Sequence, residues 1–313
     1  MPAGLARPAS AQRATWPTQP IRFIGIFPPG GGTDTLSRIW CNRMSEITGH
    51  SFVVENRSGS GGNVGTEAIA RATPDGNTIG LASVSSLAIA PTLYRRLPYD
   101  VNRDFSYVCG LWQLPNLLIV RNGLPARSVP ELIALCRADP GRYSFGSSGA
   151  GTTLHIAGEM FKAMAGVDIL HVPYKGSSQA LTDVVAGQVT MLFDNAPSSI
   201  GFVQQGKLRA VAVTGTKRLP SLPDVPTIDE AGVKGYESLS WSGIAAPAGT
   251  PRPIIDKLNQ AIDRVLKMDD VRQKFAAMGV EPVGGPPEAF TQHIRTETDK
   301  WGKLIKTSNI SVN

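Results

Sequence analysis

Apolar residues in the first third of the chain alternate between two spacings. Residues 21–27 form an apolar run with β-branched side chains, which predicts a strand that ends at a Pro- and Gly-rich stretch. Residues 35–47 place apolar side chains at helical spacing, and residues 51–55 resemble a second strand. A helix through 66–71 and a strand at 78–82 follow. This order is typical of a βαβαβ unit, a parallel sheet with helices on its faces.

The middle of the chain repeats this alternation. Strands are predicted at 143–146, 169–172, 189–193 and 210–213, with helices at 153–165, 176–186 and 200–205 between them. Two strand-like pieces between 105 and 120 flank residues 113–116. Ser128 is a predicted N-cap, and Glu131 completes a capping box for a helix to residue 138. The middle therefore predicts a second βα-repeating unit.

The last part of the chain is mainly helical. Residues 217–235 are rich in Pro, Gly and charge and predict a long surface segment. Helices are predicted at 254–267, 271–278 and 287–306. The predicted fold class is α/β, and the 313 residues fit two domains of about 150 residues each.

Composition and charge exclude several classes of protein. Hydrophobic residues make up 42% and charged residues 18%, so the chain as a whole is not disordered, collagen-like or a coiled coil. The formal net charge of +6 is scattered, and no basic patch with interleaved aromatic residues predicts binding to nucleic acid. No run of about 18 apolar residues predicts a membrane span.

Cysteine and histidine spacing gives no sign of a metal site. Cys41, Cys109 and Cys136 form no C-x-x-C motif, and a bridge between Cys109 and Cys136 stays open because spacing cannot show it. The four histidines are far apart and form no H-E-x-x-H motif, so we expect no metal.

The amino terminus contains an A-x-A signal at residues 9–11, like the end of a secretory signal peptide. The basic start and apolar stretch that usually precede such a signal are missing. We interpret residues 1–15 as a leader remnant or linker and expect an upstream coding region to supply the rest. The alternative is chance, because A-x-A is common in alanine-rich sequence.

Two Gly-rich loops carry the candidate chemistry. Residues 27–34 and 145–153 each combine a strand end, a Gly-rich loop with Thr, and a helix start. Two helix N-termini on two domains favour an anion in the cleft between them, because backbone N–H groups and the helix dipole are positive there. The loops lack nucleotide-binding glycine spacing, and no G-x-S-x-G motif supports Ser147, His155 and Asp194 as a hydrolase triad.

Each polar candidate in these loops also has a purely structural interpretation. Thr33, Ser147 and Thr152 provide hydroxyl donors for a carboxylate, but they equally fit helix caps. His155 lies about one turn into its helix and fits a functional role, as a ligand contact or a brace for the loop, or a structural one, as a capped or packed histidine. Asp34 fits a ligand group or an acceptor for backbone donors at a helix start.

Four further candidates stay open in the same way. Lys175 fits a counter-charge for an anion or a solvated loop lysine. Trp16, Trp112 and Trp241 fit positions in the core or in the cleft, and the sequence does not choose between them.

Taken together and in order, the motifs resemble a known family. They are F-P-P-G-G-G-T-D at 27–34, V-E-N-R at 54–57, P-D-G at 74–76, G-S-S-G at 146–149, V-P-Y-K-G at 172–176, L-P-S-L-P-D-V-P-T at 219–227 and A-P-A-G-T-P at 246–251. From about residue 16 to 310 the chain resembles the solute-binding proteins of the tripartite tricarboxylate transporter system, the Bug family of periplasmic receptors.

This resemblance implies a two-domain periplasmic-binding-protein type II fold with the ligand in the interdomain cleft. Domain 1 would comprise residues 16–118 plus 243–313, and domain 2 residues 119–242. The ligand-binding residues that it implies or places nearby are Phe27, Pro28, Gly30, Thr33, Asp34, Ser83, Ser85, Ser147, Ser148, Gly149, Gly151, Thr152, His155, Lys175, Gly176 and Asp194. The sequence departs from the family pattern at 152–154, where T-T-L replaces Ser- and Pro-rich residues.

The implied function is that of a periplasmic, monomeric receptor without enzymatic activity, cofactor or metal. It would capture a small carboxylate by domain closure and deliver it to the membrane components of a tripartite tricarboxylate transporter. Two alternatives stay open: a periplasmic sensor module for the same solutes, and an α/β enzyme that uses the same cleft. The resemblance does not identify the solute.

Overall fold

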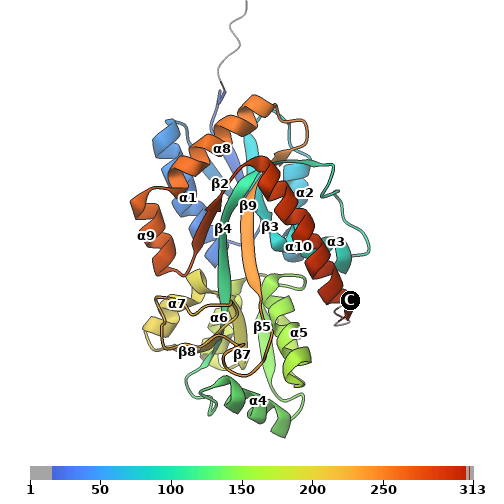
Figure 1. Ribbon diagram of the computed structural model, residues 1–313, viewed down its shortest axis with the longest axis vertical. Coiled ribbons are helices and arrows are strands. Elements are labelled where there is room, and N and C mark those ends of the chain that lie inside the picture. The colour runs from blue at the N-terminus through green and yellow to red at the C-terminus, as the bar shows by residue number, and fades with distance from the viewer. Residues whose placement is uncertain (1–15, 308–309, 311–313) are drawn as a thin grey trace, which may run out of the picture.

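The computed structural model describes residues 16–307 and 310, and the A-x-A signal at residues 9–11 lies outside the described residues. Two lobes, one above the other in Figure 1, share two long central strands, β4 (Phe105–Arg121) and β9 (Leu239–Pro247). Every other strand belongs to one lobe only. In the described part of the chain, no helix is long and apolar enough to cross a membrane.

The upper lobe contains a sheet in the order β2-β1-β3-β9-β4, with β10 also paired to β4. Its remaining strands are β1 (Ile21–Gly25), β2 (Phe52–Asn56), β3 (Thr78–Ser83) and β10 (Glu281–Gly284). β1 is parallel to β2 and β3, whereas β9 is antiparallel to β3 and β4. The predicted parallel βαβαβ unit is therefore confirmed, and two antiparallel strands extend it.

Helices cover the upper sheet on both sides. α1 (Gly32–Thr48), α8 (Arg252–Leu266) and α9 (Asp269–Ala277) pack together on one side. α2 (Asn63–Ala70), the short α3 (Ala90–Leu93) and α10 (Pro287–Thr307) lie on the other. Two short turns, η1 (Ser60–Gly62) and η2 (Ser85–Ile89), precede α2 and α3.

The lower lobe contains the order β4-β7-β5-β6, with β8 also paired to β4. Its strands are β5 (Ser144–Ser147), β6 (Leu170–Pro173), β7 (Met191–Asn195) and β8 (Leu208–Val213). Its helices are α4 (Val129–Ala138), α5 (Thr153–Ala165), α6 (Ser177–Ala186) and α7 (Ala196–Gln204). β5 is parallel to β6 and β7, so the second βα-repeating unit is confirmed as well.

The long strand β4 differs from the two short pieces that the sequence predicts. Residues 113–116 do not interrupt it, because Pro115 pairs with Leu239 of β9 and the next residue, Asn116, pairs with Asn195 of β7. The partner of β4 thus changes from the upper to the lower lobe between Pro115 and Asn116. The domain boundaries at 118/119 and 242/243 stay a prediction.

The structure tests the predicted cap of α4 and the possible bridge between Cys109 and Cys136. The Ser128 side chain accepts a hydrogen bond from the backbone N–H of Glu131, so the predicted N-cap is confirmed. The Glu131 carboxylate accepts from the N–H of Arg127 rather than from Ser128, so the capping box is shifted by one residue. Cys109 and Cys136 are buried free thiols with no bridge between them.

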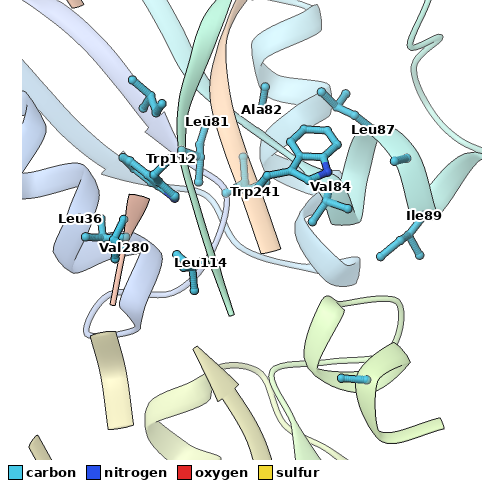
Figure 2. Packing of buried hydrophobic residues seen from close by; sticks show 14 of the residues in the cluster. Leu36, Leu81, Ala82, Val84, Leu87, Ile89, Trp112, Leu114, Trp241 and Val280 are labelled. Atoms are coloured by element: carbon cyan, nitrogen blue, oxygen red, sulfur yellow. The ribbon is translucent and has the colours of Figure 1, made fainter. Parts of the chain in front are cut away.

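Large apolar side chains fill the space between the upper sheet and its helices. Figure 2 shows Trp112 and Leu114 beside β4 and Trp241 beside β9, and Leu114 is the nearest of the three to the lower lobe. Trp112 is fully buried and contacts Phe275 of α9 edge to face, with ring centroids 6.0 Å apart. The core thus reaches the junction of the lobes and forms one wall of the site described next.

Candidate ligand-binding site

A cleft lies where the two lobes meet beside β4 and β9. The empty space between its walls amounts to about 520 Å³, which includes crevices narrower than a water molecule and the part open to solvent. The residues that line it are Phe27, Pro28, Gly31, Gly32, Thr33, Ser83, Ser85, Trp112, Leu114, Ser148, Thr152, Thr153, Leu154, Gly176, Ser177, Asn195, Ser240, Trp241 and Ser242. None of these side chains carries a charge, so any anion bound here is held by backbone and hydroxyl groups.

Four helices begin at this cleft. α1 enters from the upper lobe, and α5, α6 and α7 enter from the lower lobe. The first N–H groups of a helix have no partner inside the helix, and the helix dipole makes this end positive. The cleft therefore gathers partial positive charge without any cationic side chain.

The start of α1 is open to a ligand because its own acidic residue points elsewhere. No described side chain caps the N-terminus at Gly31. The Asp34 carboxylate instead accepts hydrogen bonds from the N–H of Gly30, from Arg38 Nε and from Asn56 Nδ2, at 3.0, 3.0 and 2.9 Å. Burial alone would raise the pKa of Asp34, but these hydrogen bonds hold it below its usual value. Asp34 therefore shapes the loop and does not line the cleft.

The loop before α5 is also shaped by its own hydrogen bonds. The Thr152 hydroxyl accepts from the N–H of His155 as the N-cap of α5, and it donates to the carbonyl of Gly149 at 2.7 Å. His155 Nδ1 accepts from the N–H of Gly151 at 3.2 Å. Thr152 thus caps its helix and lines the cleft, whereas His155 is buried behind the loop.

A second histidine lies behind the same loop. His171 Nε2 is 2.7 Å from the hydroxyl of Ser147, and this hydroxyl accepts from the N–H of Gly149 at 3.2 Å. The rings of His155 and His171 stack with centroids 4.2 Å apart. Burial lowers the pKa of His155 to about 4 and that of His171 to about 3, so both rings are neutral near pH 7.

Asp194 lies beneath the starts of α6 and α7. It is fully buried, and its carboxylate accepts hydrogen bonds from the hydroxyls of Ser177 and Ser198. Burial raises the pKa of Asp194 to about 6, and the hydrogen bonds from these serines oppose that rise. These two helix starts therefore already face a carboxyl group of the protein. This leaves α1 and α5 as the better places for a ligand anion.

Paired strands β3 and β9 add a row of small hydroxyl side chains. Ser83 and Ser242 are register partners, and both line the cleft together with Ser240. Between these two serines of β9, Trp241 donates from Nε1 to the carboxylate of Glu297 at 2.9 Å. Trp241 is 5% exposed and lines the cleft, so it lies both in the core and at the cleft wall, the two positions between which the sequence does not choose.

The lobes touch each other across the cleft. A Cβ placed on Gly176 would lie 2.9 Å from Cγ of Pro28, and one on Gly32 would lie 3.2 Å from Cβ of Asn195. The Tyr94 hydroxyl of the upper lobe donates to the carbonyl of Ala150 in the lower lobe at 3.1 Å. The structure is thus that of a form in which the two lobes are closed on each other.

The structure sorts the sequence-predicted site residues into three groups. Phe27, Pro28, Thr33, Ser83, Ser85, Ser148, Thr152 and Gly176 line the cleft. Gly149 and Lys175 line a wider hollow next to it, which shares Phe27, Pro28 and Ser148 with the cleft. Gly30, Asp34, Ser147, Gly151, His155 and Asp194 are not among the lining residues of either space. Of the three groups, only the first two can touch a ligand in this form.

Several lining residues have no counterpart among the predictions. Ser240 and Ser242 lie on β9, a strand that the sequence does not predict. Asn195 is the last residue of β7, directly after the buried Asp194, and the sequence does not show that it lines the cleft. Ser177 follows the predicted Gly176 and begins α6, so a search for polar residues at predicted helix starts would have found it. Among the described residues, no group of three His, Cys, Asp or Glu side chains could hold a metal ion.

Comparison with known proteins decides the family. Residues 36–310 match the model of the tripartite tricarboxylate transporter family receptor. The chain belongs to this receptor family. It is 35% identical to the Bug-family protein BugT of Bordetella pertussis, over 97% of this chain and 93% of BugT.

Solved structures agree on fold. This receptor superposes on R. palustris Rpa4515 with adipate at a TM-score of 0.92 and 40% identity, covering 95% of this chain and 99% of that one. It superposes on MatC from Rhodopseudomonas palustris with bound malate at a TM-score of 0.87 and 30% identity, covering 93% and 100%. The receptor therefore has the two-domain α/β fold of type II periplasmic binding proteins, as the family resemblance implies.

Proposed function

We propose that this receptor binds a small di- or tricarboxylate, or an aromatic acid, in the interlobe cleft and delivers it to the membrane components of a tripartite tricarboxylate transporter. The observation that carries the proposal is that the uncapped start of α1 and the hydroxyl-rich loop before α5 line one cleft, and that no charged side chain lines it. Two related structures are described with adipate and with malate, which are both dicarboxylates.

The ligand carboxylate is proposed to bridge the lobes. On the upper side it would accept from the first N–H groups of α1 and from the Thr33 hydroxyl. On the lower side it would accept from the Ser148 hydroxyl and from the first N–H groups of α5, since the Thr152 hydroxyl already donates to Gly149. A group that makes contacts in both lobes only when they are closed favours the closed form, which is the form that a transporter would recognise.

Lys175 gives the proposal a second feature. Among the described residues, it is the only cationic one that lines the cleft or the adjoining hollow, and the two spaces share Phe27, Pro28 and Ser148 as lining residues. A ligand long enough to leave the cleft would bring its far end toward this ammonium group. The periplasmic location and the monomeric state belong to the same proposal.

A thermal-shift screen of purified protein tests the binding step. Each carboxylate is compared with its amide, which has similar size but no charge. A ligand that binds only the folded state adds about 2.7 kcal/mol of stability at 100 times its dissociation constant. A melting-temperature rise with acids and none with amides supports the proposal. Equal shifts with both, or release of a converted product, would refute it in favour of a different ligand class or of an enzyme.

Matched variants of Thr33 then locate the carboxylate. Thr33→Val removes the hydroxyl and keeps the shape, and Thr33→Ser keeps the hydroxyl. We expect Thr33→Val to weaken binding by about 10- to 150-fold, the range that one hydrogen bond to a charged group supplies. Thr33→Ser should bind nearly as the parent does. If both variants bind like the parent, the carboxylate lies elsewhere.

Uptake into proteoliposomes tests delivery. Vesicles that contain the membrane components of a tripartite tricarboxylate transporter should accumulate the labelled acid only when the receptor is added. Uptake that does not depend on the receptor would contradict a transport role.

A further inference from the structure

We propose that His171 is a positioning residue for the ligand-binding loop 147–152: its imidazole holds Ser147, and through Ser147 the backbone of Gly149, so that Ser148 and Thr152 face the cleft. His171 does not line the cleft itself. The inference rests on the proposed function, since it concerns the loop that would hold the ligand carboxylate.

The first support is the geometry of the contact. His171 lies on β6, and the residue that pairs with it on β5 is Phe145, two positions before Ser147. Its Nε2 is 2.7 Å from Ser147 Oγ, which in turn accepts from the N–H of Gly149 at 3.2 Å. Ser147 is 0% exposed, so water does not compete for these bonds. The chain of contacts ends one residue from Ser148, which lines the cleft.

The second support is that the ring of His171 is itself fixed. It stacks on Phe145 with centroids 4.8 Å apart and an angle of 24° between the planes, and on His155 at 4.2 Å and 31°. The imidazole is therefore held between two other rings and cannot turn away from Ser147 without breaking both contacts. A side chain locked by packing is what a precisely placed binding group needs behind it.

The third support is that the two stacked histidines hold different N–H groups of one loop. His171 acts on Gly149 through Ser147, and His155 accepts directly from the N–H of Gly151. Both glycines have positive φ values, of 126° and 79°. A loop with two such residues has many alternative conformations, because glycine restricts the backbone least. Two imidazole-based contacts select one of these conformations before a ligand arrives.

Lowered pKa values agree with this arrangement. Burial lowers the pKa of His171 to about 3 and that of His155 to about 4, so both rings stay neutral at neutral pH. A neutral ring has one acceptor nitrogen, which His155 needs to accept from Gly151. Two stacked cationic rings would also repel each other.

The test compares two variants of His171. His171→Phe keeps a flat ring in the stack but removes the nitrogen that contacts Ser147. His171→Gln gives up the ring but can present an amide near the position of Nε2. We measure the dissociation constant of the acid identified in the thermal-shift screen by calorimetry, together with the melting temperature without ligand. His50→Phe is the control, because His50 lies at the far end of α1 with no contact to the cleft.

We expect His171→Phe to weaken binding about tenfold, the upper part of the range for one hydrogen bond, and His171→Gln to recover part of that loss. Ser147→Ala should weaken binding by a similar factor, and the double variant Ser147→Ala/His171→Phe should lose no more than either single variant, since both remove the same link. His50→Phe should bind like the parent.

Three outcomes would overturn the inference. His171→Phe can bind the acid as tightly as the parent does. Its loss of affinity can multiply with that of Ser147→Ala, which would mean that the two residues act independently. Finally, His171→Gln can fail to restore any affinity, while the loss of affinity in every variant is proportional to its loss of melting temperature. That result would mean that His171 only stabilises the fold. A parent protein that binds no acid would instead refute the proposed function, and this inference with it.

Discussion

Closure of the lobes over a ligand can be tested at Gly176. This residue has φ −172°, an extended conformation that any residue adopts, so alanine adds no backbone strain. Its Cβ would lie 2.9 Å from Cγ of Pro28 in the opposite lobe. Non-bonded carbon atoms prefer about 3.5–4.0 Å, so the lobes would have to stop short by at least about 0.6 Å at this point.

The magnitude follows from the stiffness of the contact. Pro28 is a ring with little freedom to move aside, and overpacking of this kind costs about 1–3 kcal/mol. In the proposed mechanism the lobes close over the ligand, so the cost of this clash falls on the ligand-bound state. At about 1.4 kcal/mol per factor of ten, Gly176→Ala should weaken binding by about 5- to 150-fold.

Calorimetry with the best acid measures the effect, and the melting temperature without ligand shows whether the lobes themselves are damaged. Gly201→Ala is the matched control, because a Cβ there meets nothing within 4 Å and alanine suits its position in α7. Gly176→Ala should keep the unliganded melting temperature and lose affinity, and Gly201→Ala should lose neither. A dissociation constant of Gly176→Ala within twofold of the parent would refute the closure argument.

Three other predictions address the mouth of the cleft and the effect of pH. Tyr94→Phe removes the hydroxyl that bonds Ala150 across the lobes, and it should weaken binding by about 2- to 13-fold, mainly through faster dissociation; an unchanged dissociation rate would contradict this. Lys175→Met should lower the affinity for long diacids several-fold at low salt and leave the affinity for short monoacids unchanged. An equal loss of affinity for both kinds of acid would exclude a contact between Lys175 and the far end of the ligand. Acid should destabilise the fold. The pKa values of His155 and His171 are lowered in the folded state. As the pH falls below about 6.5, these two histidines are therefore protonated in the unfolded chain while they are still neutral in the folded one. Asp194 has its pKa raised to about 6, so it takes up a proton in the folded state, and this uptake offsets that of one histidine in the unfolded chain. Burial also lowers the pKa of His293, which acts in the same direction. The free energy of unfolding should thus fall by at least about 1.4 kcal/mol per pH unit between pH 6 and 5, as measured by chemical denaturation, and a stability that does not fall would refute the assignment of neutral histidines.

The sequence predicts the parallel units because their signals are local. Strands such as β1 and β3 are mainly apolar, and α1 and α5 begin directly after Gly-rich loops. These loops place Thr33 and Thr152 at helix starts, and the structure brings both to one cleft.

The strand β9 is different because its residues are chosen by neighbours far away in the chain. A Cβ on Gly243 would lie 2.2 Å from Phe290 of α10, so the strand needs small residues there and shows no long apolar run. Without β9, Ser240 and Ser242 could not be placed at the cleft. The single long strand β4 depends on distant partners in the same way, since Leu239 of β9 pairs with Pro115 and Asn195 of β7 pairs with the next residue, Asn116.

Some predicted site residues proved to be supports because burial depends on tertiary structure. The sequence shows that Asp34 and His155 lie near helix starts, but not that Arg38 and Asn56 turn the Asp34 carboxylate away from the cleft. In the same way, Asp194 lies beneath Ser177 and not at the surface of the cleft. His171 gave no signal, since its partner Ser147 is 24 residues away in the sequence.

The central claim is that the cleft recognises a carboxylate through contacts from both lobes. Isothermal titration of the purified receptor with adipate and with its diamide tests this most directly, because the two compounds share length and shape and differ in charge. The account predicts saturable one-to-one binding of the diacid, or of another diacid from the screen, and no measurable binding of the matching diamide. Equal affinity for a diacid and its diamide would contradict it.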